Sequence, residues 1–137
     1  SVFHDSVMKS IFTQIINKEI PCHLIAENQD SIAFMDINPI ALGHVLVVPK
    51  KEVDNIFDLD SHTYHALWDF AQTVSFALKK TIPCNRIGIS VIGLEVPHAH
   101  IHLIPINKIG DMDFQKKVSS SSINLENLAQ KISNNII

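Results

Sequence analysis

The stretch that decides how this chain is interpreted spans residues 98–105 and reads His98-Ala99-His100-Ile101-His102-Leu103-Ile104-Pro105. Side chains of a β-strand point alternately to opposite faces, so a strand here places three imidazoles on one face, roughly 6 to 7 Å apart. The apolar residues between them then point the other way, into a core. A single strand histidine is usually a packed or surface residue, but three in strict alternation with apolar residues indicate a functional site.

The composition indicates one ordinary domain and excludes several classes of partner. The chain has 137 residues, of which 46 % are hydrophobic, enough to bury a core. A net charge of -3 and a single arginine, Arg86, argue against binding of a nucleic-acid backbone. No apolar run approaches the roughly 20 residues of a membrane span, so we expect no membrane partner. Cys22 and Cys84 form no CxxC pair and suit a reduced, cytoplasmic protein.

The hydrophobic pattern predicts an α+β fold with an antiparallel sheet of about five strands, a long helix between strands and short terminal helices. The expected helices lie at 11–18, 61–80 and around 125–132, and the expected strands at 22–27, 31–36, 44–49, 86–92 and 96–105. Residues 110–122 are polar and are expected to form a loop. Residues 11–137 are expected to form a single domain. Residues 1–10 are interpreted as an N-terminal extension, either not native or an added leader, with Met8 as a candidate natural start.

The long helix predicted over 61–80 has more apolar surface than one contact requires. One stripe contains Tyr64, Leu67, Trp68, Ala71, Val74 and Leu78, and a second contains Ala66, Phe70 and Ala77. A helix packed on a single core would leave one of these stripes exposed. The pattern therefore predicts a second partner surface, most simply a homodimer.

Three neighbouring imidazoles suit phosphoryl or nucleotidyl transfer. Because the ordinary pKa of histidine is near ~6.5, one imidazole can be a neutral nucleophile while another is protonated and holds an anion. Attack by the neutral imidazole on phosphorus forms a phosphoramidate intermediate. The alternative is a zinc site with three histidine ligands, to which Glu95 and His44 could contribute from neighbouring segments.

The histidine stretch resembles the signature of the histidine triad (HIT) superfamily, and the upstream segments are similar to its Hint branch of nucleotide-binding hydrolases. The similar segments, in the same order, are Ile11-Phe12, Lys18-Glu19-Ile20-Pro21, Ala33-Phe34-Met35-Asp36-Ile37-Asn38-Pro39 and Gly43-His44-Val45-Leu46-Val47-Val48-Pro49-Lys50-Lys51. The resemblance covers nearly everything from Ile11 to Pro105. It implies a HIT-like fold and a purine nucleotide as substrate, with no cofactor or metal.

The resemblance also implies a role for individual residues. His100 is the nucleophile that attacks the α-phosphorus, His102 holds phosphate oxygens or assists the leaving group, and His98 and His44 orient the nucleophile. Asp36 binds the ribose hydroxyls, although by its position alone it could equally be a turn residue before Asn38-Pro39. The expected substrate-binding set consists of Ile11, Ile15, Phe34, Asp36, Ile37, Ser90, Glu95 and Val96, of which Ile11, Ile15 and Phe34 line the purine pocket.

The chain departs from the family pattern at two places. Many Hint proteins have Gly-Gln-Ser or Gly-Gln-Thr before the triad, where this chain has Gly93-Leu94-Glu95, and Ser90 is the weak substitute for a phosphate-facing asparagine. Zinc-binding members have cysteines where Ser10 and Thr13 stand, so that structural zinc site is expected to be absent. We therefore expect a nucleoside phosphoramidase or related nucleotide hydrolase. The alternatives are a catalytically weakened nucleotide-binding regulatory module and a three-histidine metal enzyme.

Overall fold

The computed structural model describes residues 9–119 and 123–137. The helices are α2 (Ile11–Ile16), η1 (Ile56–Asp58), α3 (Ser61–Thr81), η2 (Ile109–Met112) and α4 (Leu125–Asn134). The strands are β1 (Leu24–Glu27), β2 (Ser31–Met35), β3 (Val45–Pro49), β4 (Arg86–Ser90) and β5 (Ile101–Ile106). The predicted extension at residues 1–10 falls mostly outside the described residues. Within them, no helix combines the length and the apolar character that crossing a membrane requires.

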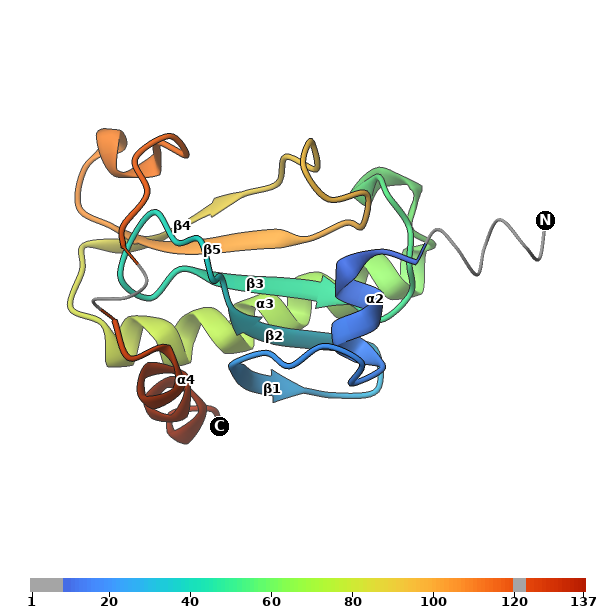
Figure 1. Cartoon of the computed structure of the whole chain (residues 1–137), viewed down its shortest axis with the longest axis horizontal. Helices are drawn as coiled ribbons and strands as arrows, with labels where there is room; N and C mark the ends of the chain where they lie inside the picture. The colour runs from blue at the N-terminus through green and yellow to red at the C-terminus, as the bar shows by residue number, and fades with distance from the viewer. Residues whose placement is uncertain (1–8, 120–122) are drawn as a thin grey trace.

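The strands form one sheet in the order β1-β2-β3-β5-β4, and every neighbouring pair is antiparallel. In the sequence, the helix α3 lies between β3 and β4. In the fold, it lies along one face of this sheet (Figure 1). The structure thus confirms the predicted α+β class, with about five antiparallel strands and one long helix between them. The central strands β2, β3 and β5 are buried on both faces, which explains their nearly continuous apolar sequences.

The alternation of side chains along the central strands separates a structural face from a second, smaller apolar face. Val45, Val47, Ile101 and Leu103 belong to the main core, which α3 and α4 cover. The intervening side chains point to the opposite face, where a second cluster consists of Phe12, Ile32, Phe34, Leu46 and Val48. The candidate site lies on this second face.

The structure corrects the interpretation of the two apolar stripes of α3. Phe70 and Ala77 of the second stripe are buried in the main core together with Leu67, Ala71, Val74 and Leu78 of the first stripe. The terminal helix α4 contributes Leu125, Ala129 and Ile132 to this same core. Most of the apolar surface of α3 is therefore covered within the chain, by the sheet and α4 together. Tyr64 and Trp68 are only partly buried, and Phe76 is 65% exposed.

The predicted strand 96–105 is wrong at its beginning, since β5 starts at Ile101. The neighbouring strand β4 ends at Ser90, which pairs with His102, so the residues before Ile101 have no partner on that side. Their backbone bonds go elsewhere, and the Ala99 N–H donates to the Val53 carbonyl oxygen at 2.7 Å. Of the three triad histidines, only His102 lies in a strand.

Other boundaries differ by a few residues. The first helix ends at Ile16, two residues earlier than predicted, because Lys18 adopts a left-handed conformation with φ of 63°. The predicted loop at 110–122 begins with part of the 3-10 helix η2, and residues 120–122 lie outside the described residues.

Candidate active site

A cavity of about 420 Å³ lies on the face of the sheet opposite α3. Its floor consists of Phe34 from β2, Leu46 from β3 and His102 from β5, and α2 and the segments after β4 and η2 surround it. This volume is in the range of small-molecule sites, and the lining is mostly apolar, as in such sites. The polar side chains that line it are Asp36, Asn38, Glu95, His100, His102 and Lys117.

Hydrogen bonds determine the tautomers of His98 and His100. Nε2 of His98 lies 2.8 Å from the carbonyl oxygen of Pro49, which can only accept, so in the neutral ring Nε2 carries the proton. Nδ1 of His98 is then an acceptor, and the Ser10 hydroxyl donates to it at 2.6 Å. The backbone carbonyl oxygen of His98 accepts the Nδ1–H of His100 at 2.7 Å. His100 therefore has its proton on Nδ1 and its lone pair on Nε2.

Ser10 is itself held by a carboxylate. Its backbone N–H donates to Oε1 of Glu52 at 2.8 Å, and the Thr13 hydroxyl donates to the same oxygen. Ser10 also caps α2, because its hydroxyl oxygen accepts the Thr13 N–H at 3.0 Å. The oxygens of Ser10 and Thr13 thus form a hydrogen-bond network that ends on His98, the first histidine of the triad.

A second chain of hydrogen bonds orients His44 and His102. The Ile40 N–H donates to Nδ1 of His44 at 3.0 Å, so the proton of the neutral His44 ring is on Nε2. That N–H donates to Nδ1 of His102 at 2.9 Å and leaves the proton of His102 on its own Nε2. Gly43, which precedes His44, has a φ of 86°, and a Cβ there would lie 2.9 Å from Cγ1 of Ile82, so this turn accepts only glycine without strain.

Burial keeps all four imidazoles neutral near pH 7. It lowers the pKa of both His44 and His102 to about 3, and the positive charge of Lys117 lowers both values further. Burial also lowers the pKa of His98 and of His100, and for His100 the carboxylates of Asp36 and Glu95 only partly oppose it. The predicted combination of one neutral and one protonated imidazole is therefore wrong for the free protein at neutral pH.

Asp36 serves both a turn and the site. Its Oδ1 accepts the Asn38 N–H at 2.7 Å, as expected for a turn residue before Asn38-Pro39. Its Oδ2 lies 3.3 Å from Nε2 of His44, and the side chain lines the cavity. Despite this carboxylate, burial dominates at His44 and holds its pKa low. One oxygen of Asp36 is thus fixed by the backbone, and the carboxylate has further lone pairs for a ligand hydroxyl.

The structure brings most of the predicted site residues to one cavity. Those that line it are Ile11, Ile15, Phe34, Asp36, Ile37, Glu95, Val96, His100 and His102. His98 and His44 lie behind the lining residues and are fully buried. Ser90 does not line the cavity; it pairs with His102 in the β4–β5 ladder. The rings of His100 and His102 lie 4.8 Å apart, closer than the spacing expected for a regular strand.

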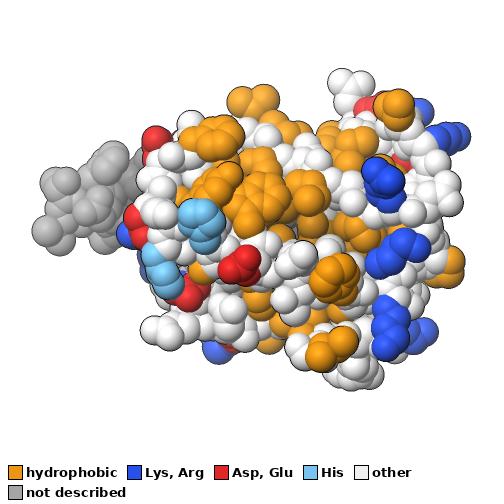
Figure 2. Space-filling view, turned by 180° about the vertical axis from the view of Figure 1, so that it is seen from behind, with side chains coloured by type: hydrophobic (Ala, Val, Ile, Leu, Met, Phe, Trp, Pro, Cys, Tyr) orange, Lys and Arg blue, Asp and Glu red, His pale blue; other side chains and the backbone are white. Residues whose placement is uncertain are grey.

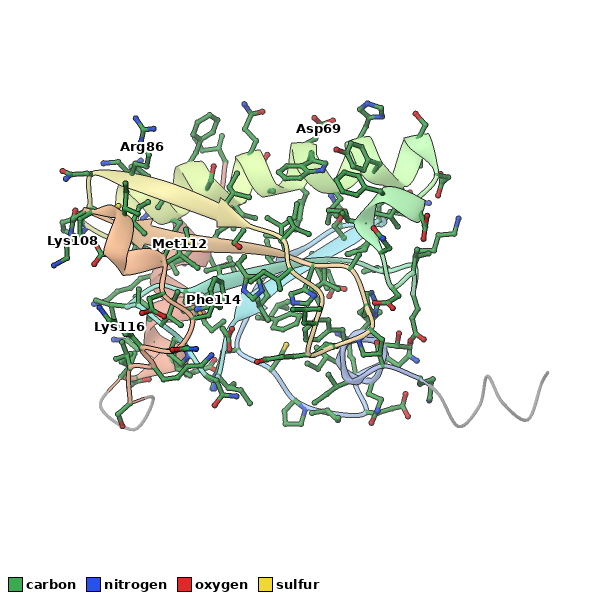
Figure 3. The ribbon with its side chains drawn as sticks, turned by 90° about the horizontal axis from the view of Figure 1, so that it is seen from above. Asp69, Arg86, Lys108, Met112, Phe114 and Lys116 are labelled. Carbon is green, nitrogen blue, oxygen red and sulfur yellow. The ribbon has the colours of Figure 1, made fainter. Side chains whose placement is uncertain are left out.

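Sequence reasoning missed two lining residues near the C-terminus. Phe114 places its ring 4.9 Å from that of His102 in an edge-to-face arrangement, and Figure 3 shows it close to β5, the strand that carries His102. Lys117 lines the cavity from the same segment. Both lie in a stretch that the sequence pattern predicts only as a polar loop. The only signal in the sequence was the presence of one aromatic and one cationic side chain in that stretch.

The geometry does not favour a metal site made of the triad. Both ring nitrogens of His98 are hydrogen-bonded within the protein, so this histidine has no free ligand atom. Among the described residues, the histidine, cysteine and carboxylate groups that come within 4.8 Å of one another are Asp36, His44 and His102. There, Nε2 of His44 and Nδ1 of His102 already bond to each other.

Comparison with known proteins gives a consistent result. The HIT domain family matches residues 17–109. An uncharacterized HIT-like protein of Borreliella burgdorferi is 33% identical over 92% of this chain and 97% of its own length. The adenosine 5'-monophosphoramidase of Saccharomyces cerevisiae is 34% identical over 69% of this chain and 61% of its own length.

Solved structures have the same fold. A Hit-like protein from Bartonella henselae, described as involved in cell-cycle regulation, superposes with a TM-score of 0.78 and 32% identity, covering 93% of this chain and 96% of that one. A hypothetical histidine triad nucleotide-binding protein from Sulfolobus tokodaii has a TM-score of 0.74 and 27% identity over 91% of this chain and 90% of that one.

Proposed function

Since this chain belongs to the HIT domain family, we propose that it is a nucleotide-binding hydrolase that acts on purine nucleoside phosphoramidates or related nucleoside phosphates. The reaction passes through a nucleotidyl intermediate on His100. The phosphoramidase activity named for the yeast relative supports this choice of substrate, as does the nucleotide binding named for the Sulfolobus protein. No cofactor or metal is required for the reaction.

The observation that carries the proposal is the state of His100. It lines the cavity, its Nδ1–H is donated to the His98 carbonyl oxygen, and burial keeps the ring neutral. A neutral imidazole with Nδ1 protonated has its nucleophilic lone pair on Nε2. The hydrogen bond also stabilises the positive charge that develops on the ring as Nε2 forms a bond.

The reaction has two steps. Nε2 of His100 attacks the α-phosphorus, the P–N bond of the phosphoramidate breaks, and its electron pair leaves with the amine nitrogen, which takes up a proton. The Nε2–H of His102 is placed to donate a hydrogen bond to a phosphoryl oxygen or to the leaving nitrogen. Water then attacks phosphorus, and the bond to His100 breaks to release the nucleoside monophosphate.

The rest of the cavity suits a purine nucleoside. Ile11, Ile15 and Phe34 form an apolar wall for the base, and Ile37 is 59% exposed beside it. The carboxylate of Asp36 accepts ribose hydroxyl hydrogens with the lone pairs that the Asn38 N–H leaves unused. Ser90 is not among the lining residues, so its predicted role would be indirect, through the pairing partner His102.

The test is turnover of adenosine phosphoramidate by wild type and His100→Ala. The variant should lose turnover while its affinity for adenosine monophosphate stays within about tenfold. Rapid quenching of the wild type should trap an adenylyl group on His100, detected by mass spectrometry. His62→Ala, at an exposed position of α3, is the control and should keep full activity. Retained turnover in His100→Ala would remove the nucleophile from the proposal.

A second candidate is a nucleotide-binding regulatory module with weakened catalysis. Leu94 is 89% exposed, and Glu95 places a carboxylate in the cavity, where it repels a substrate phosphate. This candidate predicts nucleotide binding without measurable turnover by the wild type, so the same assay separates the two.

We also propose that the protein is a cytoplasmic homodimer. The support is an apolar area on the side of the molecule where α3 lies (Figure 2), together with exposed apolar side chains near the edge strand β4. These include Phe57, which is 81% exposed, and Ile89, which is 51% exposed. Light scattering should give about twice the chain mass of 15.3 kDa. Phe57→Glu should then yield a monomer, whereas a wild type that is already monomeric at micromolar concentration would exclude the dimer.

A further inference from the structure

The segment after η2 forms part of the cavity although it lies beyond the HIT match, which ends at residue 109. The Val118 N–H donates to the Pro39 carbonyl oxygen at 2.8 Å and ties this segment to the turn that follows β2. Phe114 packs its ring against His102, and Lys117 lines the cavity beside it. We propose that Lys117 binds the phosphate of the nucleotide, an inference that rests on the proposed function.

The charges around the cavity favour a cation as a binding partner for an anionic ligand. Two carboxylates, Asp36 and Glu95, line it, and both repel a phosphate. His100 and His102 are neutral in the free protein because they are buried. Within the part of the chain that the structure describes, Lys117 is the only lysine or arginine among the lining residues. It is therefore the one side chain there that brings a positive charge to the phosphate.

The position of Lys117 fits this role. Its Nζ donates to the Asn38 carbonyl oxygen at 3.2 Å, in the turn that also holds Asp36. An ammonium group has three N–H donors, so two are left for phosphate oxygens. Lys117 also lies close enough to His44 and His102 for its charge to lower the pKa of both rings.

The competing explanation is that Lys117 only anchors the segment to Asn38. That role would affect every ligand of the cavity alike, whereas phosphate binding affects only ligands that carry the phosphate. Adenosine and adenosine monophosphate differ by this group alone. Lys117→Gln keeps an N–H donor for the Asn38 carbonyl oxygen and removes the charge, and Lys117→Arg keeps the charge.

The experiment measures binding of both ligands by calorimetry at low salt. Lys117→Gln should weaken adenosine monophosphate binding by about tenfold, the size of one charge-assisted hydrogen bond, and change adenosine binding by less than about twofold. Lys117→Arg should restore most of the loss. The matched control is Lys116→Gln. Lys116 is exposed, does not line the cavity and lies nearer the edge of the molecule than Phe114 does (Figure 3), so this variant should behave as wild type.

The outcomes separate this inference from the proposed function. If Lys117→Gln keeps the wild-type preference for adenosine monophosphate over adenosine, or weakens both ligands equally, the phosphate role is overturned and the proposed function stands. If the wild type binds neither adenosine nor adenosine monophosphate, the proposed function is overturned, and so is the phosphate-binding role of Lys117. In turnover assays, the charge loss should raise KM for adenosine phosphoramidate and leave kcat within about threefold.

Discussion

Lowering the pH from 7 to 5 should destabilise this protein strongly, because the site keeps buried histidines neutral. His44 is fully buried and His102 nearly so, and burial lowers the pKa of each to about 3. In the unfolded chain the same side chains have a pKa near ~6.5. Between these two values the unfolded state binds protons that the folded state does not, so the free energy of unfolding falls as the pH falls.

The size of the effect follows from these values. An unfolded histidine with a pKa near 6.5 is stabilised by about 2 kcal/mol between pH 7 and pH 5, while a folded one with a pKa of about 3 stays unprotonated. His44 and His102 together therefore remove about 4 kcal/mol, a large part of the 5 to 15 kcal/mol typical of a domain. His98 and His100 shift the stability in the same direction, since burial lowers their pKa as well.

Urea unfolding, repeated at every half pH unit from pH 7 to pH 5, measures this loss of unfolding free energy. The lower limit of pH 5 lies above the range in which most carboxylates titrate. Near pH 5 the slope should be at least about 2.7 kcal/mol per pH unit, which corresponds to two protons taken up on unfolding. His102→Gln should reduce the loss over the window by about 2 kcal/mol, whereas His62→Gln, at an exposed position, should not. A free energy of unfolding that stays constant to pH 5 would refute the neutral, buried state of these histidines.

Three further outcomes are expected at the site. Ser10→Ala removes the donor to Nδ1 of His98 and should lower kcat for adenosine phosphoramidate by about tenfold with little change in KM. Ser10→Thr should recover this loss. An equal change in kcat and KM would mean that Ser10 does not act through His98. Asp36→Ala should weaken ribonucleotide binding by about 1 to 3 kcal/mol and should weaken 2′,3′-dideoxynucleotide binding much less. Equal losses of affinity for both ligands in a binding assay would mean that Asp36 serves only the turn. The carboxylate of Glu95 should repel an anionic leaving group, so the wild type should have a higher kcat/KM for adenosine phosphoramidate than for a dinucleoside polyphosphate. Glu95→Ser should reduce the ratio of these two kcat/KM values by roughly five- to a hundredfold. An unchanged ratio would mean that other residues determine the specificity.

The sequence alone was sufficient for the sheet, the long helix and part of the cavity lining. Alternation in β2 and β3 separates residues such as Val47, which face the main core, from residues such as Leu46, which line the cavity, and this pattern is local along the chain. The order of the similar segments placed Asp36 and His100 in one site. Where the sequence was wrong, at the beginning of β5, the error came from treating alternation as proof of a strand although no partner strand extends that far.

Only the tertiary structure decided the tautomers, the charges and the closure of the site. Ser10 contacts His98 across 88 positions of sequence, and Glu52 contacts Ser10 across 42, which no local pattern encodes. The low pKa values of His44 and His102 arise from burial by the whole fold, so the spacing of the histidines could not predict them. The coverage of α3 by α4, and of the cavity by Phe114 and Lys117, likewise depends on where distant segments pack. Sequence periodicity determines which face of an element is buried, but the group that covers that face is determined by packing between elements.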